Sequence, residues 1–402
     1  MSAWRQVILG DVCSLVTDGK HGDCRNEDNS GYFFISAKDI RNGRINYENA
    51  RQITQDDFAE THRRTDLKPG DLLITNSGTI GRMAIAADDE RTPRTTFQKS
   101  VAVLKSKPHE VSSRFLYYYL NANLAALIHP AAGAAQKNLL LGDIRRFSIK
   151  RPSLDDQERI VATISTYDEL IENNRRRIGL LDEAARLLYR EWFVYFRFPG
   201  HEHVKITNGL PEGWQHRTLG EIADTNLESY QASELPEEVN YVDISSVERG
   251  RIVSKSRLVS SEAPGRARRR AKDGDVIWSN IRPNLRAYSM ILSPEDNDVF
   301  STGFTLLTAR DVPFVWLYLF VTTDSFVGHL VNHATGAGYP AVRPDDFKRA
   351  DVCVPPKSLL QSFQEVTEPS FRLISQLDIQ NQKLTEARDL LLPRLMSGEI
   401  AV

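Results

Sequence analysis

The sequence predicts an α+β protein: two tandem pseudo-symmetric α/β modules separated by two long antiparallel coiled-coil helices. Three observations predict this fold. Segments recur in the same order about 200 residues apart, short β-like runs alternate with turn residues in each copy, and each copy ends in a long apolar heptad pattern. In a chain of 402 residues, these features indicate a duplicated pair of domains.

The repeat is visible from the start of each copy. Trp4 is followed by Leu9-Gly10, and Trp214 is followed by Leu219-Gly220. Further matches follow in the same order: Gly70-Asp71 with Gly274-Asp275, Phe115–Leu120 with Phe314–Leu319, Gly133-Ala134 with Gly336-Ala337, and Leu181–Leu188 with Leu384–Leu391. Five matches in one order favour duplication over coincidence, and the long period excludes a solenoid.

Each copy begins with a globular module. Runs such as Asp71–Thr75 and Val276–Trp278 are typical of strands, and Asn42-Gly43 and Asp273-Gly274 are typical of tight turns. One helix, near residues 112–127 in the first copy, interrupts each set of strands. We therefore predict globular modules over residues 1–153 and 214–356. A linker at 197–213 precedes the second module.

Each module is followed by a predicted long helix, over residues 154–196 and 357–402. In the first, Ile160, Ile164 and Ile171 step by four and seven residues, and Asn174 continues the ladder. A buried Asn in such a seam usually fixes register. Helices of about 35 residues are about 50 Å long. Their apolar stripes can bury against each other, which predicts an antiparallel pair with a pseudo-two-fold axis.

Two modules on a stiff spacer suit a ligand with a long regular repeat. Duplex DNA is such a ligand, because half-sites one turn apart lie about 34 Å from each other. The loops of the two modules differ in sequence, so each is expected to read a different half of an asymmetric, interrupted target. Glycine-rich loops can offer N–H groups to phosphate, Arg suits guanine and Asn suits adenine.

The residues predicted to contact DNA are mostly polar or basic and fall at equivalent points of the two copies. In the first module they are Lys20, His21, Thr75, Asn76, Ser77, Thr79, Arg82, Gln98, Lys99, Gln136, Lys137 and Asn138. In the second module they are Arg268, Arg269, Arg270, Ser279, Asn280, Arg282, Asn284, Arg286, Thr302, Tyr339 and Arg343. A solvated turn is the alternative interpretation of each loop taken alone.

These features together resemble the specificity subunits of type I restriction–modification systems. The resemblance rests on the Trp–Leu-Gly openings, Thr17–Gly22, Gly70–Thr75, Gly78–Gly81, Gly133 with Gln136–Leu139, and Pro152 with Gln157–Ile160 before a long helix. The second copy departs from this pattern, because no counterpart of Asp18–His21 stands near Glu228. That departure leaves its DNA contacts less defined.

The resemblance implies a non-catalytic DNA-binding subunit with several partners. These are double-stranded DNA, two modification (methyltransferase) subunits and, in some complexes, restriction or translocase subunits. The chain itself would bind no cofactor, and S-adenosylmethionine would be bound by the modification subunits. The surfaces predicted to bind those subunits lie on the long helices and comprise Glu158, Arg159, Asn173, Arg176, Glu191 and Arg388.

The competing enzyme classes find little support in the residues. An Asn/Asp-Pro-Pro-Tyr/Phe motif of amino-methyltransferases is absent, and Asp57 with Asp66 and Lys68 only loosely imitates a nuclease metal site. His329 and His333 lack the glutamate of a His-Glu-x-x-His site, so no metal is expected. A protein-binding scaffold with duplicated modules remains the alternative function.

Composition sets the remaining limits. Basic and acidic residues number 51 and 53, so any attraction for DNA must be local. Three cysteines cannot form a disulfide framework, which suits a reducing cytoplasm. The apolar run Phe314–Val321 is too short to span a bilayer, so no membrane association is expected.

Overall fold

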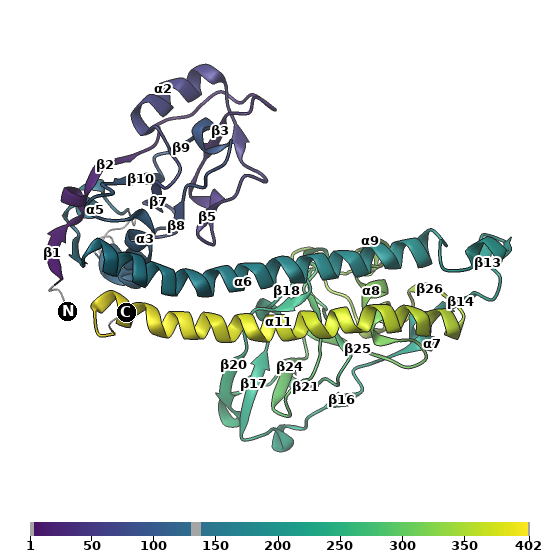
Figure 1. The fold of residues 1–402 in the computed structure, drawn as a ribbon. Helices are drawn as coiled ribbons and strands as arrows, with labels where there is room; N and C mark the ends of the chain where they lie inside the picture. The colour runs from purple at the N-terminus through teal and green to yellow at the C-terminus, as the bar shows by residue number, and fades with distance from the viewer. Residues whose placement is uncertain (1–3, 130–137, 401–402) are drawn as a thin grey trace. The chain divides into compact units, whose positions relative to one another are not determined.

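The computed structural model describes residues 4–129 and 138–400, which form two compact units (Figure 1). One unit combines the chain up to residue 172 with the residues from 381 onward, and the other comprises residues 173–380. Each unit contains one α/β module and parts of the two long helices. The predicted fold class is confirmed.

The first module contains these helices and strands: β1 (Arg5–Ile8), α1 (Leu9–Val12), β2 (Cys13–Asp18), β3 (Phe33–Ile35), β4 (Ile40–Arg41), β5 (Arg44–Ile45), β6 (Arg51–Gln52), α2 (Gln55–Thr65), β7 (Leu72–Thr75), β8 (Met83–Ile85), β9 (Thr95–Phe97), β10 (Val101–Ser106), α3 (Ser113–Ala122), α4 (Leu124–Ile128), α5 (Leu141–Arg146) and β11 (Ser148–Arg151). The helix expected near residues 112–127 is thus divided into α3 and α4.

The second module follows a short hairpin of β12 (Ile206–Thr207) and β13 (Leu210–Pro211). It contains β14 (Gln215–Thr218), α7 (Leu219–Ile222), β15 (Ala223–Thr225), β16 (Glu228–Ser229), β17 (Glu238–Val242), β18 (Val247–Glu248), β19 (Arg251–Ile252), β20 (Ser256–Val259), β21 (Ala267–Arg270), β22 (Val276–Ser279), β23 (Tyr288–Met290), β24 (Asp298–Ser301), β25 (Phe304–Ala309), α8 (Phe314–Val321), α9 (Asp324–His333), α10 (Pro344–Lys348) and β26 (Asp351–Val354).

The same four-stranded sheet lies at the centre of both modules. Its strand order is β2-β10-β7-β8 in the first and β15-β25-β22-β23 in the second. The central pairs also share a register, because Leu104 lies opposite Leu72 as Leu307 lies opposite Val276. A β1–β11 pair and a β14–β26 pair flank these sheets in the same way. The internal repeat therefore extends to the pairing of individual residues.

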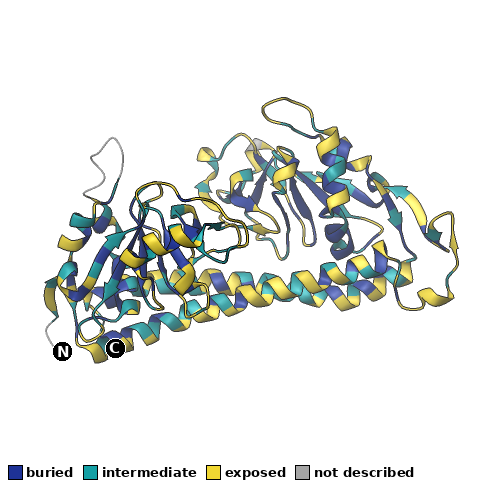
Figure 2. Cartoon of the chain, turned by 90° about the horizontal axis from the view of Figure 1, so that it is seen from above, coloured by how far each residue is buried: buried dark blue, intermediate teal, exposed yellow. Residues whose placement is uncertain are grey.

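Both faces of the central sheet are covered, which explains its nearly continuous apolar strands. On β10, Ala102 and Leu104 join one core while Val101 and Val103 join another. The first of these cores is closed by α3, whose Phe115 is fully buried. Figure 2 shows these strands as largely buried elements beneath exposed loops.

The modules differ in their second sheet. The first has three strands, in the order β6-β3-β9, accompanied by helix α2. The second has five strands, in the order β16-β21-β24-β17-β20. A parallel pair is common to both, β3 with β9 and β17 with β24. The strands that differ between the modules thus lie outside the four-stranded central sheet that both modules share.

Two long helices follow the modules: α6 (Leu154–Tyr189), which continues into a π-helical turn over Arg190–Val194, and α11 (Lys357–Ser397). Much of the predicted seam is buried, including Ile160, Ile164, Ile171 and Asn174. The Asn174 amide donates a hydrogen bond of 3.1 Å to Gln380 of α11. This contact supports the register role expected of a buried Asn.

Within each unit, opposite ends of the two helices meet. Ile160 and Ile164, near the start of α6, share a core with Leu395 and Met396 at the end of α11. In the other unit, Tyr189 at the end of α6 packs against Phe363 near the start of α11, with ring centroids 6.2 Å apart. The helices therefore pair in antiparallel fashion, as predicted.

In the described part of the chain, no single helix is long and apolar enough to cross a membrane. One pair, α8 with α9, meets the length and composition requirements only together, and it is bent by 61°.

The aromatic cluster between α6 and α11 generates a prediction about stability. Phe363 is fully buried, and its ring lies 4.8 Å from Phe193 and 5.6 Å from Trp192. Phe363→Ala should lower the free energy of unfolding of this unit by about 3–5 kcal/mol, because it leaves a cavity. Guanidinium denaturation followed by tryptophan fluorescence measures this change.

Val366→Ala is the matched control, because Val366 lies on the same helix and is 58% exposed. Its unfolding free energy should change by less than about 0.5 kcal/mol. Equal losses in the two variants would contradict the assignment of Phe363 to the core.

Candidate nucleic-acid interface

In the first module, the candidate interface begins where β7 ends. The Thr75 hydroxyl donates to the carbonyl of Thr79 at 2.5 Å and accepts from the Arg82 amide at 2.9 Å. The Gly81 amide also donates to the Thr75 carbonyl. These bonds close a compact loop over residues 75–82. Ser77 is half-buried in this loop, whereas Thr79 and Arg82 are exposed.

Two further segments meet this loop. The Asn76 amide donates to the carbonyl of Ser100, and the Asn76 carbonyl accepts from the Leu139 amide. Ser77 and Asn138 form an isolated β-bridge, as do Lys20 and Gln98. The structure thus brings most of the predicted first-module residues to one end of the central sheet. Gln136 and Lys137 lie outside the described residues.

Gly19 allows one of these close approaches. A Cβ atom at this position would overlap the Phe97 carbonyl, so no other residue fits without displacing the backbone. The Lys20 amide then donates to the Phe97 carbonyl at 2.8 Å. This geometry accounts for the glycine in the segment Asp18–His21.

The charges around Lys20 are largely neutralised within the module. Its ammonium lies 2.9 Å from Glu60 and 3.4 Å from Asp57, and the neighbouring His21 ring lies 3.0 Å from Asp18. A hydrogen bond from the Arg25 amide is the main cause that lowers the pKa of Asp57 to about 2. Lys20 therefore stabilises α2 against the strand end, and its charge is not free for phosphate.

Arg82 and Lys99 present the opposite case. Both side chains are exposed, and within residues 4–129 and 138–400 neither forms an ion pair. Asn76 is 8% exposed, and its carbonyl Oδ1 has no hydrogen-bond partner among the described residues. Arg82 and Lys99 thus offer two cationic groups at this sheet end, whereas the Asn76 Oδ1 atom is buried beside them.

The second module repeats this arrangement with different residues. The Ser279 hydroxyl donates to the Ile281 carbonyl at 2.9 Å at the end of β22. The Asn280 amide donates to the Gly303 carbonyl, and the Asn280 carbonyl accepts from the Val342 amide. The loops at residues 279–286, 302–303 and 335–342 therefore converge as their counterparts do. Asn280, Thr302 and Tyr339 lie on these three loops, and their contact with DNA stays a prediction.

The loop after β22 has an unusual backbone. Arg282 and Arg286 adopt positive φ values of 50° and 57° on either side of a 3-10 turn. The Arg282 guanidinium lies over the Tyr339 ring at 4.6 Å, and Tyr339 is 72% exposed. Asn284 is exposed at the tip. Arg282 and Tyr339 thus form an exposed cation–π pair, a flat surface suited to base edges or stacked bases.

Arg286 has a different role. Its guanidinium lies 2.5 Å from Asp324 at the start of α9, and its side chain is 24% exposed. Positive φ costs about 1 kcal/mol or more for a residue of this kind, and the ion pair offsets part of that cost. Arg286 anchors the loop rather than presenting a free guanidinium. The sequence carries no signal for this pairing, because Asp324 is remote in the chain.

The basic run at residues 266–272 lies on and beside β21, in the other sheet of the module. Arg270 and Lys272 both pair with Glu228, at 3.8 and 2.7 Å. Arg269 donates to the Ser229 hydroxyl, and burial lowers its pKa. Arg268 is half-buried. Much of this predicted positive charge is thus neutralised locally. Arg343 is exposed at the start of α10.

The predicted partner-binding residues divide into two groups. Glu158, Arg159, Asn173 and Arg176 are exposed on α6. Glu191 pairs with Arg197 at 3.2 Å, and Arg388 pairs with Asp168 at 2.7 Å while its side chain is 27% exposed. The Arg388 guanidinium therefore joins α11 to α6 within one unit, and its contact with a partner subunit stays a prediction.

Comparisons with known proteins agree with this arrangement. Residues 1–182 match a family described as "Type I restriction modification DNA specificity domain". The chain is 26% identical to the type I restriction enzyme MjaIX specificity subunit of Methanocaldococcus jannaschii, over 92% of this chain and 87% of that protein. It is 20% identical to the HindI specificity subunit of Haemophilus influenzae, over the full length of both.

The fold also matches a solved structure. The type I restriction–modification S subunit from M. genitalium superposes with a TM-score of 0.61 at 16% identity, over 98% of this chain and 96% of that one. In its duplicated modules, its antiparallel helices and its sequence, the chain is similar to type I restriction–modification specificity subunits, and residues 1–182 match their DNA specificity domain.

Proposed function

We propose that this chain reads a bipartite, asymmetric DNA target, with one half-site recognised by each module. The observation that carries the proposal is the repeated gathering of polar and basic side chains at the same end of the same sheet. Thr75 and Asn76 in one module correspond to Ser279 and Asn280 in the other, and the loops that follow these strand ends carry Arg82 and Arg282. One scaffold thus carries two different sets of base-reading groups.

The chemistry of the two sites favours DNA over a protein ligand. Arg can bond guanine in a bidentate manner, and the amides of Asn and Gln can do the same with adenine. Exposed Arg82 and Lys99 suit phosphate contact. Because α6 contains 36 residues, it is about 54 Å long, a length suited to an interrupted target.

The long helices support a second role, the assembly of modification subunits. Leu170, Leu180 and Leu187 of α6 are 43–60% exposed, and Leu390 of α11 is 74% exposed. Apolar side chains on an otherwise polar helix surface are typical of protein-binding faces. Together with Glu158, Asn173 and Arg176, they provide a mixed surface for docking.

In this proposal the complex acts in the cytoplasm and the chain contributes recognition and assembly, without a catalytic step of its own. The modification subunits, two per complex, bind S-adenosylmethionine and methylate adenine. Restriction or translocase subunits join the same assembly in systems that cleave DNA. A scaffold that binds only proteins is the alternative, and the salt dependence of DNA binding distinguishes the two.

The first test concerns electrostatics. The complex of this chain with its modification subunits should bind duplex DNA with a log Kd that varies steeply with log[salt]. Arg82→Ala should reduce the magnitude of that slope by about 1, because one phosphate contact is lost. Lys383→Ala, which alters an exposed residue of α11, should leave the slope unchanged. Fluorescence anisotropy at several salt concentrations measures both slopes. A flat salt dependence of the intact complex would favour the protein-only scaffold.

A second test exchanges one module. Residues 208–356 are replaced by the corresponding segment of another specificity subunit, leaving α6 and α11 intact. We expect sequencing of methylated genomic DNA to show one half of the target unchanged and the other half replaced. Replacement of both halves would contradict independent reading by two modules.

A third test separates reading from anchoring in the loop after β22. Arg282→Ala should reduce discrimination at one base pair by about 1–3 kcal/mol, with little change in melting temperature. Arg286→Ala should instead lower the melting temperature and weaken all sequences alike, because it releases the loop from Asp324. Binding to a panel of single-substitution targets measures discrimination. Unchanged discrimination in Arg282→Ala would exclude Arg282 from base reading.

A further inference from the structure

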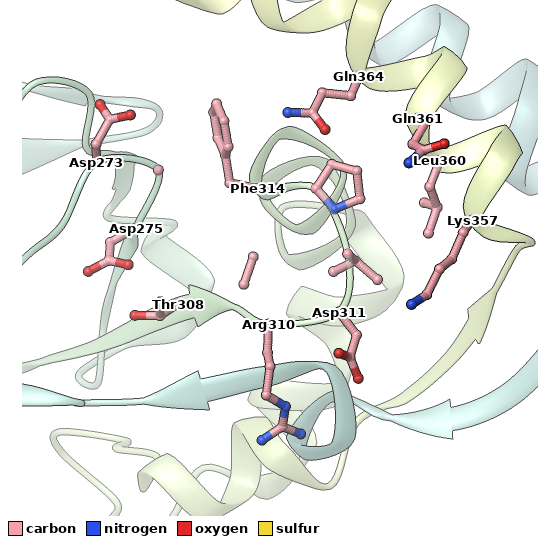
Figure 3. Close-up of a pocket in the computed structure, with 14 residues that line it drawn as sticks. Asp273, Asp275, Thr308, Arg310, Asp311, Phe314, Lys357, Leu360, Gln361 and Gln364 are labelled. Atoms are coloured by element: carbon pink, nitrogen blue, oxygen red, sulfur yellow. The ribbon is translucent and has the colours of Figure 1, made fainter.

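A cavity of about 440 Å³ lies within the second unit, between the module and the start of α11 (Figure 3). Its walls come from the turn before β22, from the segment that joins β25 to α8, and from the first two turns of α11. Asp273, Asp275 and Thr308 lie on one side, Phe314 is central, and Leu360 and Gln361 lie on the helix side.

Comparison of the two modules shows which residue differs beside this cavity. Leu104 and Leu72 are opposite each other in the first module, so the next pair along the strands is Lys105 with Asp71. Leu307 and Val276 are opposite each other in the second, so the next pair is Thr308 with Asp275. The carboxylate is therefore retained, whereas a lysine in the first copy is a threonine in the second.

In the first module the equivalent space is occupied. The Lys105 ammonium pairs with Asp71 and also donates to the Asp66 carbonyl at 2.6 Å. Gln157 of α6 is fully buried, accepts from the Ser112 amide at 2.9 Å and donates to the Glu110 carbonyl at 3.2 Å. The lysine thus ties β10 to the turn before β7, and the glutamine ties α6 to the segment between β10 and α3.

The second module has no equivalent of either the lysine or the glutamine. Leu360 stands where the first copy has Gln157, because each lies three residues before an equivalent apolar residue, Phe363 or Ile160. A leucine side chain cannot form the hydrogen bonds that Gln157 forms. The connection from β25 to α8 spans only residues 310–313, against residues 107–112 between β10 and α3. A threonine in place of lysine and a shorter connection together account for the open cavity.

Asp275 is left as a buried carboxylate without a cation. It is 3% exposed, accepts from the Lys272 amide at 2.7 Å and is hydrogen-bonded by the Thr308 hydroxyl. No ion pair to Asp275 occurs within the described ranges 4–129 and 138–400. Burial raises its pKa, because loss of hydration disfavours the charged carboxylate, while the Lys272 amide, the Thr308 hydroxyl and the Lys272 charge act in the opposite direction.

Most of the other charged groups that line the cavity are paired, whereas Lys357 at the start of α11 is exposed and forms no ion pair among the described residues. Asp273 pairs with Arg372 of α11 at 2.7 Å. Arg310 pairs with Asp224 at 3.0 Å and also donates to the Glu221 carbonyl. Lys357 lies on the helix side, away from Asp275. On the Asp275 side an anion would therefore meet a buried carboxylate, and the Arg310 guanidinium is already occupied. A cation with an apolar stem would meet Asp275 at its head and the Phe314 ring and Leu360 along its length.

We propose that this cavity binds an alkylammonium group. The group pairs with Asp275 in the same way as the Lys105 ammonium pairs with Asp71 in the first module. Two sources share this chemistry: a lysine side chain of a partner subunit and a free aliphatic diamine. The inference is independent of DNA reading, because it concerns the module–helix junction of the second unit and its binding test uses the chain alone.

The binding test uses the full chain and 1,5-diaminopentane, followed by isothermal titration calorimetry. We expect saturable binding to the unmodified chain, weakened at least ten-fold by Asp275→Asn, which is nearly isosteric. Thr308→Lys should abolish binding, because it installs the lysine of the first module, and should raise the melting temperature. Ser256→Lys adds the same charge on an exposed strand and serves as the matched control.

The second arm distinguishes the two sources. In the complex with the modification subunit, a carbodiimide cross-link from Asp275 to a partner lysine, detected by mass spectrometry, together with loss of diamine binding, identifies the partner as the source. Continued diamine binding without a cross-link identifies the free amine. The proposal is overturned if the free chain binds no diamine and the complex gives no cross-link, or if Asp275→Asn and Thr308→Lys bind diamine as the unmodified chain does.

Discussion

The fold depends on the burial of two apolar helix stripes that neither helix can bury alone. At one end of α6, Ile164 shares a core with Leu395 of α11, and at the other end Tyr189 packs against Phe363. Each such side chain contributes about 1.5–3 kcal/mol when it leaves water. Because the partners are remote in sequence, the first unit must include residues from 381 onward. Antiparallel pairing gives each module the same kind of helical support.

Given that support, the modules can vary where recognition requires it. The shared register of β10 with β7 and of β25 with β22 keeps the strand ends at Thr75 and Ser279 in equivalent positions. Variation is confined to the second sheet and to the loops, where three strands with α2 in one module correspond to five strands in the other. A constant central sheet with variable loops is how one fold can serve different ligands.

Periodicity and repetition made the helices, their seam and the strand-end loops predictable. Ile160, Ile164 and Asn174 are buried as their spacing indicates, and the repeat placed Asn76 and Asn280 at corresponding strand ends. The sequence could not predict which charges are neutralised, because ion pairs depend on tertiary contacts. Lys20 meets Glu60 across α2, and Arg286 meets Asp324 at α9. Both lysine and arginine were expected at DNA, and both proved to be anchored within their modules.

This pattern of pairing also explains how a chain with a net charge of −2 can attract a polyanion. Salt screens charges beyond about 8–10 Å, so the field at a strand end depends on nearby groups rather than on the sum. Many basic residues are neutralised where they stand, as Arg257 is by Glu238 and Arg310 by Asp224. Arg282, by contrast, bonds a neutral carbonyl and stacks on Tyr339, so its full charge is retained. Selective pairing thus leaves Arg82, Lys99 and Arg282 as unneutralised cations at the strand-end loops, where they can act on a polyanion at short range.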